Sequence, residues 1–314
     1  MTTLDRLTRW REAGIINEAQ HGVLSALVRK ERFSVFFELN AFLYLGVLSI
    51  AAGLGLTIQK YFTSLGDAFI LATLSLILLG SLYYCFSRSP AYSSGEVESP
   101  SLIFDYVLYL GCLALSVELG YIEFRYEWLK NAWDNYLLFS SLIFFVLAYR
   151  FDNRFVLSLA LSSLAGWFGL RVTRFEFNSA EPLRICGLVY GAVVALIGTF
   201  LYRQGIKKHF LAAYLHIATN VIFAAAVSGI EDRPSGPAYI LLLLLLMAAS
   251  IGLGIRFRRF AFVVYGTVYG YIGLSIELMR DVREPTTILA YLAVTGTIVI
   301  VSLALLARRF GRVE

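Results

Sequence analysis

Residues 237–255 read PAYILLLLLLMAASIGLGI, an uninterrupted run without a charged side chain. An α-helix rises about 1.5 Å per residue, so a run of this length crosses a hydrocarbon layer of about 30 Å. In lipid, every backbone N–H and C=O needs a partner within the helix or within a closed barrel. The strands of a barrel alternate polar and apolar residues, whereas this run does not alternate. The stretch therefore predicts a transmembrane helix.

Comparable apolar runs follow one another along all 314 residues, of which 58% are hydrophobic and 16% are charged. Soluble domains usually carry about a quarter charged residues. The expected fold class is therefore all-α, a polytopic transmembrane helical bundle of about ten spans. We predict these spans at residues 36–58, 67–86, 102–122, 134–150, 155–171, 183–203, 209–229, 237–255, 260–280 and 287–307.

The expected domains are a cytoplasmic amphipathic helical head (1–34), a transmembrane domain (35–308) and a short cytoplasmic tail (309–314). In the head, the spacing of the apolar residues predicts a helix over 3–13 that stops at Gly14. Asn17 followed by Gln20 has the pattern of a capping box, which predicts a second helix over 18–31. Both helices are too short to span a membrane.

The distribution of positive charge predicts the orientation of the chain. Its net charge is +5, and most of its 27 Lys and Arg residues flank the spans on the side that bears both termini. The positive-inside rule then places both termini in the cytoplasm. The excess of basic residues is explained by this topology and by attraction to anionic lipid headgroups. We therefore expect the lipid bilayer as a partner and no nucleic acid.

Two short stretches indicate an internal repeat. LSVEL at 115–119 and LSIEL at 274–278 share a frame, and seven residues before each glutamate stands a glycine, Gly111 or Gly270. The spans that precede them also match, with one shift of register in the loop 87–100. We predict a parallel duplication of spans one to four as spans seven to ten, an architecture known from transporters.

A shorter motif also recurs after even-numbered spans on the expected cytoplasmic side. It reads YRFDNRF at 149–155, YRQGIKKHF at 202–210 and IRFRRF at 255–260. A weaker two-span repeat is therefore expected to underlie the larger one. On the other side, residues 121–136 are rich in Trp, Tyr and charge, which favours a short helix lying at the membrane interface over a gate.

Four polar side chains inside predicted spans are candidate substrate- or ion-coupling residues: Glu118, Glu277, His216 and Asn220. Ionisable groups are costly in lipid, by roughly 2.5–3.5 kcal/mol at a helix centre. The two glutamates either form a paired site that faces protein, or lie in the headgroup layer as interfacial acids. His216 and Asn220 are four residues apart and share a helix face, which suits either an interhelical hydrogen bond or a proton relay. Gly111 and Gly270 are expected to pack helices closely.

Catalytic and metal-binding patterns are missing from the sequence. It has no H-E-x-x-H, no P-loop and no nucleophile elbow, and its three histidines are dispersed. The three cysteines fall in predicted spans without a C-x-x-C pair. We therefore expect no catalytic residue, no metal, no cofactor and no enzymatic activity.

The start of the chain resembles a known family. LTRWREAGIINEAQHGVL at 7–24, with a glycine-rich first span (YLGVLSIAAGLGL, 44–56), is similar to an uncharacterised bacterial membrane-protein family. That family is catalogued as domain of unknown function 2157, and the resemblance is best over residues 4–80. It implies a bacterial inner-membrane location and brings no established activity or site residues.

Three functions remain open from the sequence. The first is a secondary transporter or permease for a small solute. The second is a non-enzymatic scaffold that docks protein partners through the head, and the third is a lipid-handling membrane protein.

Overall fold

A computed structural model describes residues 3–15, 17–18, 20–21, 25, 49, 53, 66–129, 132, 134–173, 180–232 and 234–311. These residues form helices, and none of them lies in a strand, which confirms the all-α fold class. The predicted first span (36–58) and most of the second head helix (18–31) lie outside the described residues, as does the end of the tail.

The chain divides into two units, residues 1–66 with 311–314, and residues 67–310. The first unit contains α1 (Thr3–Glu12), which confirms the first predicted head helix. Gly14 follows it in the left-handed conformation with φ of 69°, where glycine carries no steric penalty. Asn17 and Gln20 form the predicted capping box, because each side-chain oxygen accepts from the other's backbone N–H at 2.8 and 2.9 Å.

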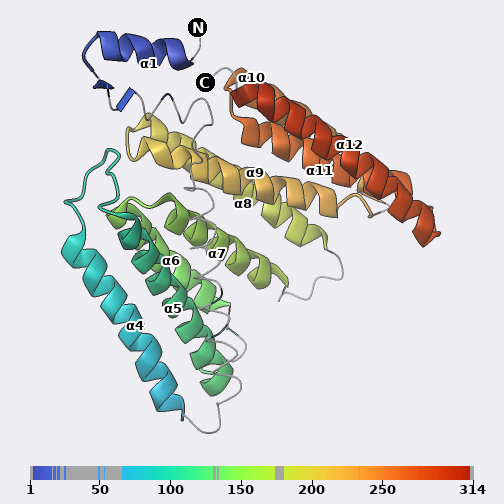
Figure 1. Ribbon diagram of the computed structural model, residues 1–314. Coiled ribbons are helices and arrows are strands. Elements are labelled where there is room, and N and C mark those ends of the chain that lie inside the picture. The colour runs from blue at the N-terminus through green and yellow to red at the C-terminus, as the bar shows by residue number, and fades with distance from the viewer. Residues whose placement is uncertain are drawn as a thin grey trace. The chain divides into compact units, whose positions relative to one another are not determined.

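Among its described residues, the second unit contains nine α-helices that correspond to predicted spans two to ten (Figure 1). Eight of them are long and apolar enough to cross a membrane, and α6 is shorter. The helices are α4 (Asp67–Arg88), α5 (Leu102–Tyr126), α6 (Asn135–Phe151), α7 (Arg154–Thr173), α8 (Glu181–Arg203), α9 (Leu211–Ser228), α10 (Gly236–Arg256), α11 (Phe260–Met279) and α12 (Pro285–Gly311), and a short 3-10 helix, η2 (Lys208–Phe210), precedes α9.

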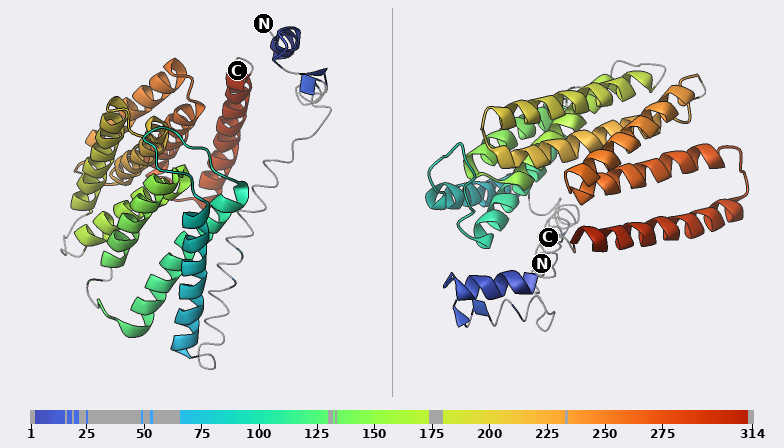
Figure 2. Two further views of the ribbon diagram at one scale, coloured as in Figure 1. Left: turned by 90° about the vertical axis from the view of Figure 1, so that its left-hand side faces the viewer. Right: turned by 90° about the horizontal axis from the view of Figure 1, so that it is seen from above.

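Consecutive helices pack as antiparallel hairpins, namely α4 with α5, α6 with α7, α8 with α9 and α10 with α11. Helix α9 also contacts α7, α10 and α11, so it joins the hairpins. One apolar core extends from α4 to α9, and a second forms around Phe223, Ile230, Tyr239 and Leu243. Helices α4 and α12 lie at the two edges of this unit (Figure 2).

The two ends of the second unit differ in their connections. At one end, called here the Asp152 end, α6–α7, α8–α9 and α10–α11 are joined by tight turns, and a longer loop, residues 89–101, joins α4 to α5. Each tight turn contains a non-glycine residue in the left-handed conformation, Asp152, Lys207 or Arg258. These residues come from the three copies of the short recurring motif. The other end, called the Arg184 end, carries the α5–α6, α7–α8, α9–α10 and α11–α12 connections.

The interfacial helix predicted over 121–136 is wrong for the residues described there. Helix α5 continues to Tyr126 and stops at Glu127, whose φ is 47°. The last turn of α5 is held against α4, because the Tyr121 hydroxyl and Arg125 Nε donate to Asp67 at 2.9 and 2.6 Å. These bonds extend the spanning helix where the sequence suggested a separate one.

The hairpins α4–α5 and α10–α11 are paired in the same way, as the predicted duplication requires. Their continuations differ, however. Helix α6 packs against α7, whereas α12 has no buried residue in its apolar window and touches α11 through the hydrogen bonds Tyr271–Thr295 and Ser275–Tyr291. The duplication itself stays a prediction.

Candidate functional site

The two repeated glutamates lie in different surroundings. On α5, Glu118 accepts a hydrogen bond from the hydroxyl of Ser75 on α4. On α11, Glu277 forms an ion pair of 2.7 Å with Arg280, which also donates to the backbone carbonyl of Ile230. Glu118 therefore faces protein, and Glu277 is a partly exposed acid at the Arg184 end.

His216 and Asn220 of α9 face two tyrosines of α11. His216 Nδ1 and the hydroxyl of Tyr265 are 3.1 Å apart, and the hydroxyl of Tyr269 donates to Asn220 Oδ1 at 3.0 Å. The imidazole also stacks on Phe262, with ring centroids 5.3 Å apart. The second pair lies four residues after the first on both helices, so the two hydrogen bonds link α9 and α11 at successive turns. This is the interhelical hydrogen bonding that the sequence suggested as one alternative.

The four candidate coupling residues thus belong to three separate contacts, at α4–α5, at the end of α11 and at α9–α11. The glycines of the two repeats both lie at helix contacts. A Cβ built on Gly111 would stand 3.1 Å from Ser81 Cβ, and one built on Gly270 would stand 2.4 Å from Met247 Sδ. Their role in the structure is therefore close packing of α5 on α4 and of α11 on α10.

A cavity of about 260 Å³ lies between α7, α8 and α9. Its lining is mainly small and apolar, and it includes Phe168, Leu183, Gly187, Tyr190 and Ala224. Phe168, Leu183 and Ala224 are also exposed on the surface of the bundle. The cavity is therefore open on one side, toward the surroundings of the spanning helices.

The cavity begins near the Arg184 end and reaches toward the middle of α8. Arg184 and Tyr190 both line it, three and nine residues after the start of α8. At about 1.5 Å per residue these positions lie roughly 5 and 14 Å from the helix end. The cavity therefore lies in the half of α8 that is nearer the Arg184 end.

One lining residue of the cavity, Arg184, belongs to a cluster of charged and polar residues, here called the rim cluster: Glu181, Arg184, Asp232 and Tyr239. Arg184 Nη1 lies 3.1 Å from Glu181 Oε2 and 2.8 Å from Asp232 Oδ2. The hydroxyl of Tyr239 donates to Glu181 Oε1 at 2.8 Å, and its ring lies beside the guanidinium. The cluster therefore connects α8, the α9–α10 connection and α10.

One donor of this cluster is left without a partner. Arg184 Nε is buried and makes no hydrogen bond, although buried polar atoms are nearly always paired. Leaving such a donor unpaired costs about 1–3 kcal/mol, and more beside a charge. Because Arg184 also lines the cavity, an acceptor oxygen at the mouth of the cavity is what this side chain lacks.

Among the three cysteines, Cys186 differs from the others in its accessibility. Cys85 and Cys112 are buried in the larger core, whereas Cys186 is partly exposed and lines the cavity. A thiol reagent that enters the cavity therefore meets Cys186. Within the described residues no group of three or more His, Cys, Asp or Glu side chains has the arrangement of a metal site.

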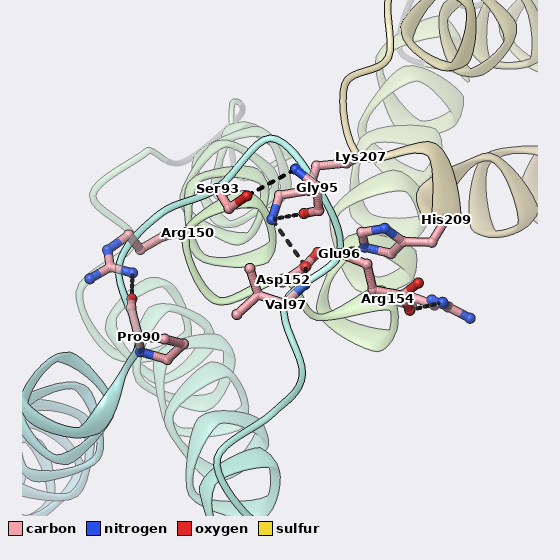
Figure 3. A network of polar contacts seen from close by, with 10 residues as sticks. All are labelled: Pro90, Ser93, Gly95, Glu96, Val97, Arg150, Asp152, Arg154, Lys207 and His209. Carbon is pink, nitrogen blue, oxygen red and sulfur yellow. Dashed lines mark hydrogen bonds and ion pairs between the residues drawn. The ribbon is translucent and has the colours of Figure 1, made fainter.

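The Asp152 end carries a second polar network, in which Asp152 is surrounded by Lys207, His209 and Val97 (Figure 3). Asp152 Oδ2 lies 3.0 Å from Lys207 Nζ and accepts from the Val97 N–H at 2.5 Å, and His209 Nε2 lies 2.5 Å from Asp152 Oδ1. Lys207 also binds the loop through its side chain, to the Gly95 carbonyl, and through its backbone N–H, to Ser94. Because these donors and acceptors satisfy one another, the network ties the 89–101 loop to two helix turns.

Sequence reasoning missed both the cavity and the rim cluster. Arg184 is the second residue of a predicted span, where a charged side chain is expected to reach the headgroup layer. Its position therefore did not indicate a binding site. A second signal was available in four small residues of three successive spans, namely Gly169, Gly187, Ala224 and Ala225. Those residues leave a void only if α7 stands away from α8 and α9, which the spacing of residues does not determine.

Comparison with known proteins bears on the first half of the chain. Residues 8–157 match a family described as "Predicted membrane protein (DUF2157)". The resemblance seen at the head and first span is thereby confirmed, and it extends through α6 into the start of α7. The match and the spanning helices together identify a membrane protein. All residues that line the cavity come after residue 157, so the match does not concern them. Comparison with curated proteins and with solved structures found no match.

Proposed function

We propose that this protein is a lipid-handling membrane protein that holds one hydrocarbon chain of an amphiphile in the cavity between α7, α8 and α9. The observation that carries the proposal is the position of the cavity. It is apolar, it opens beside exposed Phe168 and Leu183, and it ends at the charged rim cluster. A small-molecule site with an apolar lining and a few converging polar groups is the usual form of a binding pocket.

The size of the cavity limits what it can hold. Small-molecule pockets measure about 300–1,000 Å³, so 260 Å³ is at the low end. A volume at this end of the range suits a short segment of hydrocarbon chain. That is part of one acyl chain, and the remainder of the lipid stays in the bilayer. The proposal includes binding and positioning of the lipid and no catalytic step.

The other two hypotheses have less support from the geometry. A transporter that couples through Glu118, Glu277, His216 and Asn220 needs these groups along one path, and they belong to three separate contacts. Protein partners that dock on the head concern residues 1–34, of which only part lies within the described residues. We also propose, from the resemblance and the charge distribution, that the protein lies in a bacterial inner membrane with both termini in the cytoplasm.

Native mass spectrometry of the detergent-solubilised protein tests the proposal. We expect one phospholipid to stay bound to the wild type, and the alkylation of Cys186 by N-ethylmaleimide to slow in a saturable way as phospholipid is added. Ala224→Trp places a large side chain in the mouth and is expected to abolish both effects.

Ala192→Trp is the matched control. Ala192 is exposed on α8 and does not line the cavity, so its variant should retain the lipid. Loss of lipid in both variants, or retention in both, would mean that the lipid binds elsewhere. A wild type that retains no lipid and shows no protection of Cys186 would exclude the proposal.

A further inference from the structure

The rim cluster contains one buried donor without a partner and two partly exposed carboxylates. Arg184 is the deeper member, with a side chain 11% exposed, and its buried Nε lacks an acceptor. The carboxylates of Glu181 and Asp232 are 35% and 29% exposed and stand toward the surface. A ligand in the cavity therefore meets Arg184, which lines it, and lies near the two more exposed carboxylates that contact Arg184.

The charges of the cluster do not cancel. Among the described members of the cluster, one guanidinium stands between two carboxylates, which gives the cluster a net charge of one negative unit. A purely anionic headgroup brings a further negative charge close to both carboxylates, and like charges in such surroundings repel strongly. A headgroup that bears both signs leaves the net charge of the site unchanged.

We propose that the cavity selects a phospholipid whose headgroup combines an anionic phosphate with a primary ammonium. This inference rests on the proposed function. A phosphate oxygen accepts from Arg184 Nε, which supplies the missing partner. The ammonium, placed further out along the headgroup, donates to Glu181 and Asp232 at the rim.

The ammonium must carry N–H groups for this selection to operate. A primary ammonium has three donors, and hydrogen bonds between charged groups are roughly twice as strong as neutral ones. A trimethylammonium head has the same charge and no donor, so it keeps the phosphate contact alone. An anionic glycerol head keeps the phosphate contact as well, but its charge is repelled by the carboxylates.

Competition between three phospholipids with identical acyl chains tests this inference. The detergent-solubilised protein is incubated with equal amounts of phosphatidylethanolamine, phosphatidylcholine and phosphatidylglycerol, and the bound species are counted by native mass spectrometry. We expect phosphatidylethanolamine to be bound about tenfold more often than phosphatidylcholine, with phosphatidylglycerol last. Asp232→Asn and Glu181→Gln each remove one negative charge and should lower the preference for phosphatidylethanolamine over phosphatidylcholine severalfold.

Glu181→Gln keeps an acceptor for Tyr239, and Asp232 lies in a connection, so both variants are expected to fold. Glu231→Gln, an exposed neighbour in the same connection, is the control and should keep the wild-type preference. If the three lipids bind equally well and Ala224→Trp still abolishes binding, the headgroup inference fails and the proposed function stands. Preferred binding of phosphatidylglycerol also overturns the inference. If no lipid is bound in any variant, the proposed function fails first.

Discussion

Asp152 is the residue whose replacement should weaken the second unit most at the Asp152 end. We consider Asp152→Asn, because asparagine tolerates the left-handed conformation found there, with φ of 57°. The side chains of Asp152 and Lys207 are only 3% and 1% exposed. Removing one partner of a buried ion pair leaves the other charge without compensation and costs about 3–5 kcal/mol.

The geometry around Asp152 explains why asparagine cannot replace all of its contacts. The asparagine carbonyl oxygen can replace one carboxylate oxygen, but the amide nitrogen then faces Lys207 Nζ, the Val97 N–H or His209 Nε2. The free energy of unfolding is measurable by titration of the detergent-solubilised protein with sodium dodecyl sulfate, followed by circular dichroism. We expect the variant to lose about 3–5 kcal/mol relative to the wild type.

A neighbouring ion pair provides the control. Glu96 and Arg154 are paired in the same region, with side chains 60% and 53% exposed, and exposed pairs contribute about 0–1 kcal/mol. Glu96→Gln should therefore change the free energy of unfolding by less than about 1 kcal/mol. A similarly small loss in Asp152→Asn would refute the view that this network is what holds the loop and the two turns together.

Three further predictions concern packing, polar contacts and topology. Gly191→Ala should lower the free energy of unfolding by about 1–3 kcal/mol, because the new Cβ would stand 2.4 Å from Ile222 Cγ1 and near a backbone carbonyl. The control is Gly80→Ala, whose Cβ would have nothing within 4 Å. In the same titration this control should leave the free energy of unfolding unchanged or raise it. A double-mutant cycle of His216→Leu and Tyr265→Phe should give a coupling near 0.6 kcal/mol, the average for such bonds in membranes, and a coupling of zero would contradict the hydrogen bond. A single cysteine at Ser94, in a background without native cysteines, should react with an impermeant maleimide in inside-out vesicles and not in right-side-out ones; the reverse pattern would invert the proposed topology.

The positions of the helices were largely predictable from the sequence, for a physical reason. Lipid offers the backbone no hydrogen-bond partner, so a long apolar run has to be helical whatever its neighbours are. Every predicted span that lies within the described residues is a helix. The main misjudgement was at 121–136, where bonds from Tyr121 and Arg125 to Asp67 extend α5. Those bonds depend on how α4 and α5 are paired, which a single run does not reveal.

The candidate site was much less predictable, because it depends on which helix faces which. The spacing of His216 and Asn220 indicated a shared face, but their partners Tyr265 and Tyr269 come from a helix two spans later. The repeated frame around Glu118 and Glu277 suggested equivalent sites, whereas their partners are a serine of α4 and an arginine of α11. A cavity between three helices leaves no pattern in the sequence of any one of them.

The loop 89–101 also sets an order of events during synthesis of the chain. The Val97 N–H of this loop binds the carboxylate of Asp152, which is synthesised 55 residues later. Its Gly95 carbonyl binds the ammonium of Lys207, which is synthesised 112 residues later. At about 5–20 residues per second, the second partner leaves the ribosome roughly 6–22 s after the loop. Until Asp152 emerges, the Val97 N–H has only water as a partner, and until Lys207 emerges the same holds for the Gly95 carbonyl. The Asp152 end thus closes late, when the α8–α9 turn arrives, and a nascent chain stalled before Lys207 would expose this loop to proteases that the finished protein resists.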